Sequence, residues 1–143
     1  MAATYNKFQD FSQQLIRGTT HQFSSHVFKI ALTNTAPSPT DVSWLPGTTA
    51  PPPAAANGYT PGVTTITEAD VSGSTAVQGT QVVFTASGGS IGPFRYAILY
   101  NDSSSTKAVI AWWDYGSSIT IDDAEKFTVQ FSGSSPGTIF FLV

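Results

Sequence analysis

Hydrophobic residues near the start of the chain follow the period of a helix. Four of them are spaced three, three and four positions apart: Tyr5, Phe8, Phe11 and Leu15. This spacing places their side chains on one face of a helix, and Gly18 follows as a residue type that commonly ends one. The pattern predicts a single short helix over residues 4–17.

After this helix, hydrophobic and polar residues alternate, as they do in strands with one buried face. In residues 126–131, for example, Phe127, Val129 and Phe131 alternate with polar side chains. Stretches rich in Gly, Ser and Asn separate such segments and predict turns. The predicted strands span residues 26–33, 63–67, 81–86, 94–101, 107–115, 118–121, 126–131 and 138–143.

About eight short antiparallel strands form a sandwich, a jelly roll or a barrel. We predict a mainly β protein, an antiparallel β-sandwich or jelly roll with one short N-terminal helix. The length of 143 residues suits a single domain spanning residues 1–143.

A proline-rich stretch interrupts the strand pattern. Residues 36–62 contain seven of the nine prolines. Proline has no N–H to donate and favours extended, polyproline-like chain, so we expect a long irregular arm. Such an arm either packs on its own domain or docks on a neighbouring subunit. It supplies these candidate interface residues: Trp44, Leu45, Pro46, Pro51, Pro52, Pro53 and Tyr59.

The predicted hairpin of residues 94–101 and 107–115 is apolar on both faces. Strict alternation places one set of side chains together on each strand: Phe94, Tyr96, Ile98 and Tyr100, then Val109, Ala111, Trp113 and Tyr115. The opposite faces carry Arg95, Ala97 and Leu99, then Ile110, Trp112 and Asp114, so both faces are largely apolar. Both faces of this strand pair should therefore be covered.

Within this hairpin, Trp112 and Trp113 are adjacent and must point to opposite faces. Three covers are compatible with the sequence: the chain's own helix or arm, a carbohydrate, or another subunit. Aromatic residues concentrate at the centres of protein interfaces. Trp112, Trp113 and Tyr115 are therefore further candidate interface residues.

The chain is polar but carries few charges. Asp, Glu, Lys and Arg make up 10% of the residues, while seventeen serines and nineteen threonines supply much of the polarity. An average soluble domain has about 25% charged residues. The six basic residues form no stripe that could follow a phosphate backbone, so we expect no nucleic-acid partner. No segment is apolar over membrane-spanning length, and we expect no membrane partner.

The sequence offers little for catalysis. Cysteine is absent, and His21 and His26 are five positions apart with no adjacent acidic partner. The glycines of residues 87–93 lack a lysine and a following helix, which favours a turn over a phosphate loop. Three clustered carboxylates lack the spacing of a calcium loop: Asp122, Asp123 and Glu125. We expect no enzyme activity and no catalytic, metal-binding or cofactor-binding residues.

Several unbroken stretches occur in a characteristic order: YNKFQDF, HVFKIALTNTAPS, NGYTPG, VVFTASGGSIGPFRYAILYND and IAWWDYGSSITI. They resemble a family of small structural proteins of tailed bacteriophages that occur among head and capsid-assembly proteins. The resemblance covers most of the chain. The run SWLPGTTAPPPAAA departs from it, since the family pattern is shorter and less proline-rich there.

The resemblance implies a virion component made in the bacterial host cytoplasm and placed on the capsid exterior as a cement or decoration protein. Its partner would be the major capsid protein, and it would form a homo-oligomer, a dimer or a trimer, on the shell. No catalytic residues come with the family. Two alternatives are a tail, neck or fibre component and a sugar-binding module of a host-recognition fibre.

Overall fold

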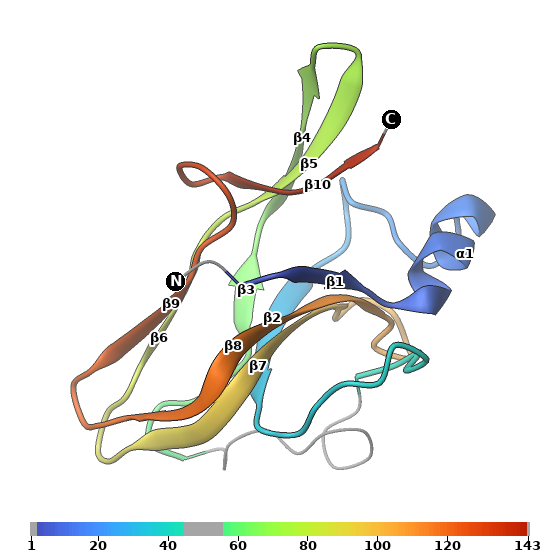
Figure 1. Ribbon diagram of the computed structural model, residues 1–143. Coiled ribbons are helices and arrows are strands. Elements are labelled where there is room, and N and C mark those ends of the chain that lie inside the picture. Colours follow the sequence, from blue (N-terminus) through green and yellow to red (C-terminus); the bar gives the residue numbers. More distant parts are fainter. Residues whose placement is uncertain (1–2, 45–55, 143) are drawn as a thin grey trace.

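A computed structural model describes residues 3–44 and 56–142, and these residues form ten strands and one helix (Figure 1). The prediction of a mainly β, antiparallel fold with one short helix is confirmed. In chain order the elements are β1 Tyr5–Lys7, α1 Gln9–Arg17, β2 Phe28–Thr33, β3 Gly62–Thr64, β4 Ile66–Val71, β5 Ser74–Gly79, β6 Val82–Thr85, β7 Ile91–Asn101, β8 Val109–Ile121, β9 Lys126–Val129 and β10 Gly137–Leu142.

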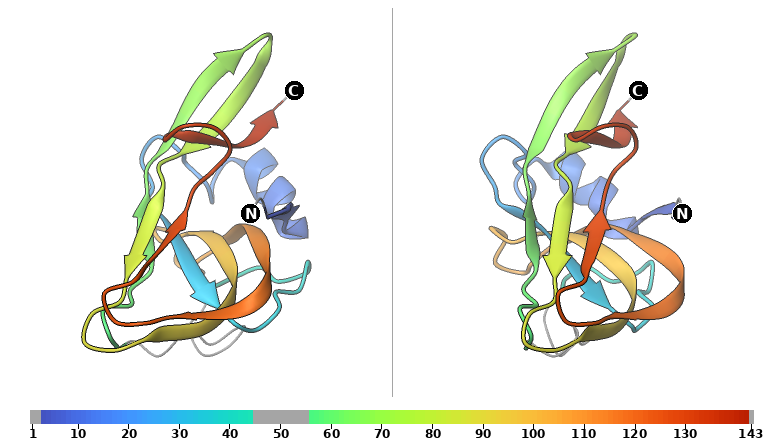
Figure 2. Two further views of the ribbon diagram at one scale, coloured as in Figure 1. Left: turned by 60° about the vertical axis from the view of Figure 1, so that its left-hand side comes forward. Right: turned by 90° about the vertical axis from the view of Figure 1, so that its left-hand side faces the viewer.

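The strands form three sheets around a shared core. A five-stranded sheet has the order β1-β8-β7-β2-β3, a two-stranded sheet pairs β6 with β9, and a three-stranded sheet has the order β10-β5-β4. Figure 2 shows β6 and β9 packed across from the five-stranded sheet, as in a sandwich. The β4–β5 hairpin projects beyond the body of the protein, with the C-terminal end of β10 beside it (Figures 1 and 2).

The predicted helix over residues 4–17 is wrong in its first turn. Residues 5–7 form β1, which pairs with β8 so that Tyr5 lies opposite Trp113. Phe8 has extended backbone angles, and the helix begins at Gln9. Strand pairing overrides the helical spacing here because it places Phe8, fully buried, on the far face of the sheet. Gly18 ends the helix in the left-handed conformation as expected.

Hydrophobic residues form two cores, one on each face of the five-stranded sheet. The main core lies between the sheets and includes Phe28, Leu99 and Phe131. The second core consists of Phe8, Ala31, Trp44, Ile98, Tyr100 and Val109, with Trp112 packed against it. The prediction that the β7–β8 hairpin is covered on both faces is confirmed.

The predicted division of the hairpin residues between its faces is partly wrong. Phe94 lies in the main core, whereas Ile98 and Tyr100 lie in the second. Val109 is likewise separated from Ala111. The β7–β8 register shifts between Phe94 and Tyr96 and again after Leu99. At the first shift β8 advances five positions, from Asp114 to Ile119, against two on β7, and at the second it advances two positions against one. An odd number of extra residues on one strand reverses the alternation on which the prediction relied.

Tyr59, from the described end of the arm, completes the backbone hydrogen bonding of β2. Strand β3 pairs with β2 only from Phe28 to Ile30, so Leu32 lies beyond that ladder. The Tyr59 hydroxyl accepts the Leu32 N–H at 2.8 Å and donates to the Leu32 carbonyl at 3.3 Å. Its ring stacks on Phe84 with centroids 5.8 Å apart. The arm is thereby attached to the centre of the sandwich.

Replacing Tyr59 with Phe should lower the free energy of unfolding by about 1–3 kcal/mol, because Leu32 would keep two buried backbone groups without their partner. Urea unfolding curves of wild type and variant measure the difference. Tyr115→Phe is the matched control, since the Tyr115 hydroxyl makes no hydrogen bond within the described residues. Equal unfolding midpoints for the two variants would contradict the bridging role.

Candidate functional site

The described ends of the proline-rich arm pack on the chain's own domain. Trp44, 2% exposed, donates its backbone N–H to the Lys107 carbonyl at 2.7 Å, and its ring centroid lies 6.3 Å from that of Tyr100. Tyr59, 4% exposed, lies in the main core. Little of either ring is therefore accessible to another subunit. The remaining candidates from the arm lie outside the described residues: Leu45, Pro46, Pro51, Pro52 and Pro53.

The two adjacent tryptophans face opposite cores, as predicted. The ring of Trp112 packs on Phe8 with centroids 4.5 Å apart. The ring of Trp113 lies 5.9 Å from that of Tyr5 and 5.4 Å from that of Phe131. Both tryptophans have a cover within their own chain and both are still partly exposed. Trp113 and Tyr115 also line a cleft, whereas Trp112 does not.

A cleft of about 690 Å³ opens beside the main core. Three of the strands that line it are each an outermost strand of their own sheet in the described part of the chain: β1, β9 and β10. The rest of the wall comes from residues 94–97 of β7, from Trp113 and Tyr115 of β8, and from Leu32 of β2. The aromatic lining includes Tyr5, Phe94, Trp113, Tyr115, Phe127 and Phe131. The volume is within the range of about 300–1,000 Å³ typical of binding pockets.

Several polar side chains line the cleft, among them Arg95, Thr128, Gln130, Ser132 and Thr138. Arg95 and Asp114 pair with each other, Nε to Oδ1 at 2.7 Å and Nη2 to Oδ2 at 2.9 Å. The Arg95 contact holds the pKa of the Asp114 carboxyl below its usual range. By contrast, the hydroxyls of Tyr5 and Tyr115 and the indole N–H of Trp113 make no hydrogen bond to any described residue. Burial raises the pKa of Tyr5 to about 12, so its hydroxyl keeps its proton.

The sequence pattern identified only part of this cleft. Trp113 and Tyr115 were candidates, but Tyr5 was assigned to the helical stripe. Phe127 and Phe131 were recognised as apolar positions of a strand, with no indication that they meet β1. Their T-shaped and tilted contacts with Tyr115 and Trp113 arise only when the strand edges converge. No local sequence pattern signals this convergence.

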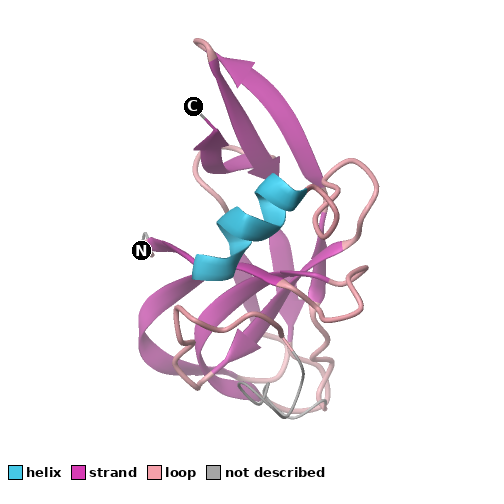
Figure 3. Ribbon diagram, turned by 90° about the vertical axis from the view of Figure 1, so that its right-hand side faces the viewer, coloured by secondary structure: helices cyan, strands magenta, loops and turns pink. Residues whose placement is uncertain are grey.

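The projecting three-stranded sheet has one uncharged face. Its register places these residues together on that face: Thr67, Ala69, Val71, Ser74, Ala76, Gln78 and Phe141. Phe141 is 51% exposed and Val71 is 44% exposed. Phe140 points the other way and packs on Phe11 with centroids 5.5 Å apart. Figure 3 shows the β4–β5 hairpin rising beyond the helix. Exposure on this face is uneven, since Ala76 at its centre is 0% exposed.

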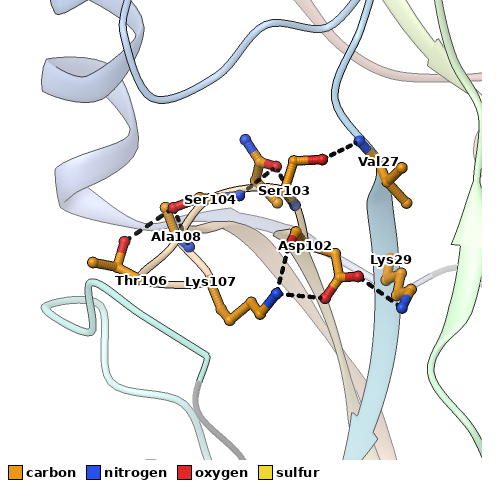
Figure 4. Close-up of polar contacts among 9 residues, drawn as sticks. Val27, Lys29, Asp102, Ser103, Ser104, Thr106, Lys107 and Ala108 are labelled. Carbon is orange, nitrogen blue, oxygen red and sulfur yellow. Dashed lines mark hydrogen bonds and ion pairs between the residues drawn. The ribbon is translucent and has the colours of Figure 1, made fainter.

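Most of the charged side chains near the β7–β8 turn pair with one another (Figure 4). Asp102 lies 2.7 Å from the Nζ of Lys29 and 3.1 Å from that of Lys107. These contacts, first that with Lys29, lower the pKa of the Asp102 carboxyl. Ser103 accepts the Val27 N–H at 2.8 Å and so ties the turn to β2. The arrangement is structural, since each charged group already has its partner.

A buried amide joins both histidines to the same turn. Asn101 Nδ2 donates to the Thr20 carbonyl at 2.7 Å and lies 2.9 Å from His26 Nδ1 and 3.4 Å from His21 Nδ1. Its Oδ1 accepts two backbone N–H groups of the turn, which fixes the orientation of the amide. A histidine nitrogen that accepts from this amide must be unprotonated. Burial, with the neighbouring His26, lowers the pKa of His21 to about 4.

Among the described residues, no group of three or more His, Cys, Asp or Glu side chains could hold a metal ion. Nor does the described part of the chain contain a helix long and apolar enough to cross a membrane. Comparison of the chain with protein-family models, with curated proteins and with solved structures finds no match.

Acid should destabilise the protein through His21. The pKa of this imidazole is about 4 in the folded chain, against about 6.5 when unfolded. Since the unfolded chain binds the proton first, the free energy of unfolding should fall by about 3 kcal/mol as the pH drops from about 6.5 to about 4. Asp10 and His26 are the titratable groups that face the ring.

The measurement is urea unfolding near neutral pH and again at about pH 4.5. We expect His21→Phe, which keeps an aromatic ring between Phe11 and Phe23, to lose this part of the pH dependence. A variant that loses as much stability on acidification as wild type would show that other groups control the response.

Proposed function

We propose that this chain is a non-catalytic structural protein of a tailed-phage virion, a cement protein that binds the capsid exterior across neighbouring major capsid subunits. The observation that supports this most directly is the projecting β10-β5-β4 sheet with its uncharged outer face. The sequence motifs that resemble phage head proteins favour a phage virion as the assembly. The sheet offers a surface for contact with it.

The composition of that outer face suits a protein partner. Exposed Phe141 and Val71 stand among small and hydroxyl-bearing side chains, with no Asp, Glu, Lys or Arg on the face. Interface centres are similarly depleted in charge and enriched in aromatic residues. A hydrogen-bonded sheet also holds these side chains in place before binding, which limits the entropy lost on association.

Binding of this kind would stabilise a shell by mass action. Contacts that span two capsid subunits exist only in the assembled state, so their free energy favours assembly over dissociation. The same surface would also serve in a tail, neck or fibre. Copy number separates these alternatives, because a cement protein is present in hundreds of copies and a tail or fibre protein in small multiples of the vertex symmetry.

Replacing Phe141 with Glu should abolish attachment to capsids while leaving the free protein folded. Phe141 points away from the core, so the change places a charge on the outer face without disturbing the packing of Phe140. Quantifying protein sedimented with capsids, beside melting curves of the free variants, measures both effects. Ile16→Glu is the matched control, since Ile16 is 86% exposed on the helix. Unchanged capsid occupancy for the Phe141 variant would exclude this face as the contact.

Attachment should survive washing in about 1 M sodium chloride and be released by urea or moderate heating. Exposed ion pairs are screened at such salt concentrations, whereas apolar contacts hold or strengthen. The expectation follows from the uncharged outer face. Particles sedimented after washes of rising salt give the measurement. Stepwise release below 1 M would show that charged groups elsewhere, such as Asp122, Asp123 and Glu125, dominate binding.

A further inference from the structure

We propose that the aromatic cleft is a binding site for a neutral oligosaccharide whose sugar rings carry equatorial hydroxyl groups. The cleft is a different surface from the uncharged outer face of the three-stranded sheet, so this binding goes beyond attachment to a capsid. The inference rests on three properties of the described residues that line the cleft. They provide accessible aromatic rings and polar groups without partners, and they provide no unpaired charge.

The aromatic rings of the cleft are accessible and held in place. Four of those that line it are each partly buried: Tyr5, Trp113, Tyr115 and Phe127. The Trp113 ring packs against those of Tyr5 and Phe131, with centroids 5.9 Å and 5.4 Å apart. Tyr115 meets Phe127 edge to face at 5.7 Å. Because their neighbours already fix these rings, they lose little conformational freedom when a ligand packs on them.

The polar groups of the cleft include donors and acceptors. The Trp113 indole N–H can only donate, whereas the hydroxyls of Tyr115 and Thr128 can donate and accept. None of these three groups makes a hydrogen bond within the described part of the chain. Gln130 donates its amide N–H to the Gly133 carbonyl at 3.0 Å, which leaves its own side-chain carbonyl to accept. A ligand that satisfies them must therefore carry donors and acceptors at several positions.

The charge of the cleft favours a neutral ligand. Arg95 is the one charged side chain among the described residues that line it, and Asp114 holds it through two hydrogen bonds of 2.7 Å and 2.9 Å. An anion would have to compete with this carboxylate for Arg95. Among the same lining residues there is no acidic side chain to attract a cation. A neutral ligand enters without breaking the ion pair or burying an unpaired charge.

An oligosaccharide meets these requirements together. A sugar ring with equatorial hydroxyls has flat C–H faces that pack on aromatic rings, and its rim carries hydroxyls that both donate and accept. A purely apolar ligand would instead bury the polar groups of the cleft without partners. The volume of about 690 Å³ is that of a pocket for a drug-sized molecule, and it suits a ligand larger than a single sugar.

The first experiment titrates cellotriose and N-acetylchitotriose, to high millimolar concentration, into the full ¹⁵N-labelled chain. The three indole N–H signals provide internal controls, because Trp44 and Trp112 lie in or against the second core and only Trp113 lines the cleft. We expect a saturable shift of the Trp113 signal alone with at least one of the two sugars. Sorbitol, which has hydroxyls but no rigid C–H face, should cause no saturable shift.

The second experiment repeats the titration with variants that each lack one hydroxyl of the cleft. Tyr115→Phe keeps the ring and Thr128→Val keeps the shape of the side chain, and each should weaken binding of the sugar about fivefold. Thr67→Val is the matched control, because Thr67 is an exposed strand residue that does not line the cleft. We expect its affinity to equal that of wild type.

A Trp113 signal that neither sugar moves would overturn the proposal. So would an equal response to sorbitol, or wild-type affinity in both cleft variants. A peptide of alternating threonine and valine that moves the signal where the sugars do not would assign the cleft to an extended strand and also overturn it. None of these measurements involves capsids, so failure here leaves the proposed attachment to be judged separately.

Discussion

The β7–β8 hairpin imposes one constraint on the whole structure, because it is apolar on both faces and must be covered on both. Ile98 and Leu99 are neighbours in sequence, yet they are 2% and 0% exposed in different cores. A second sheet can cover only one face. The other cover comes from segments that belong to no sheet on that side, chiefly Phe8 before the helix and Trp44 in the arm. Both segments are therefore needed to bury this face of the hairpin.

The N-terminal segment supplies much of this second cover. Strand β1 aligns Tyr5 with Trp113 and so brings Phe8 to Trp112. The Phe8 N–H donates to the Ile110 carbonyl at 3.1 Å, and the next N–H, of Gln9, donates to the Pro39 carbonyl at 2.9 Å. Strand, helix and arm thus share one junction above the hairpin. Because the backbone groups of this junction are paired, the cover stays in place without a longer strand.

Features encoded by local patterns were predictable, and features that depend on register were not. The helix end at Gly18, most strands and the opposite placement of the two tryptophans follow from period and turn chemistry. The bulges after Phe94 and Leu99 reverse the alternation and leave no mark in a single sequence. Strand β5 has only one large apolar residue, Val77, so its pattern is weak. The cleft was not predictable because it forms where edges of three sheets meet.

The two edge strands of the three-stranded sheet differ in charge. Strand β4 is an outer strand that carries exposed Glu68 and Asp70, so two such edges repel each other and resist edge-to-edge pairing. Strand β10, at the opposite edge of the same sheet, has no charged residue and ends in exposed Phe141 and Leu142. An open apolar edge favours aggregation of a free protein unless a partner covers it. The asymmetry therefore leaves β10 as the uncharged edge of this sheet, next to both the cleft and the uncharged face.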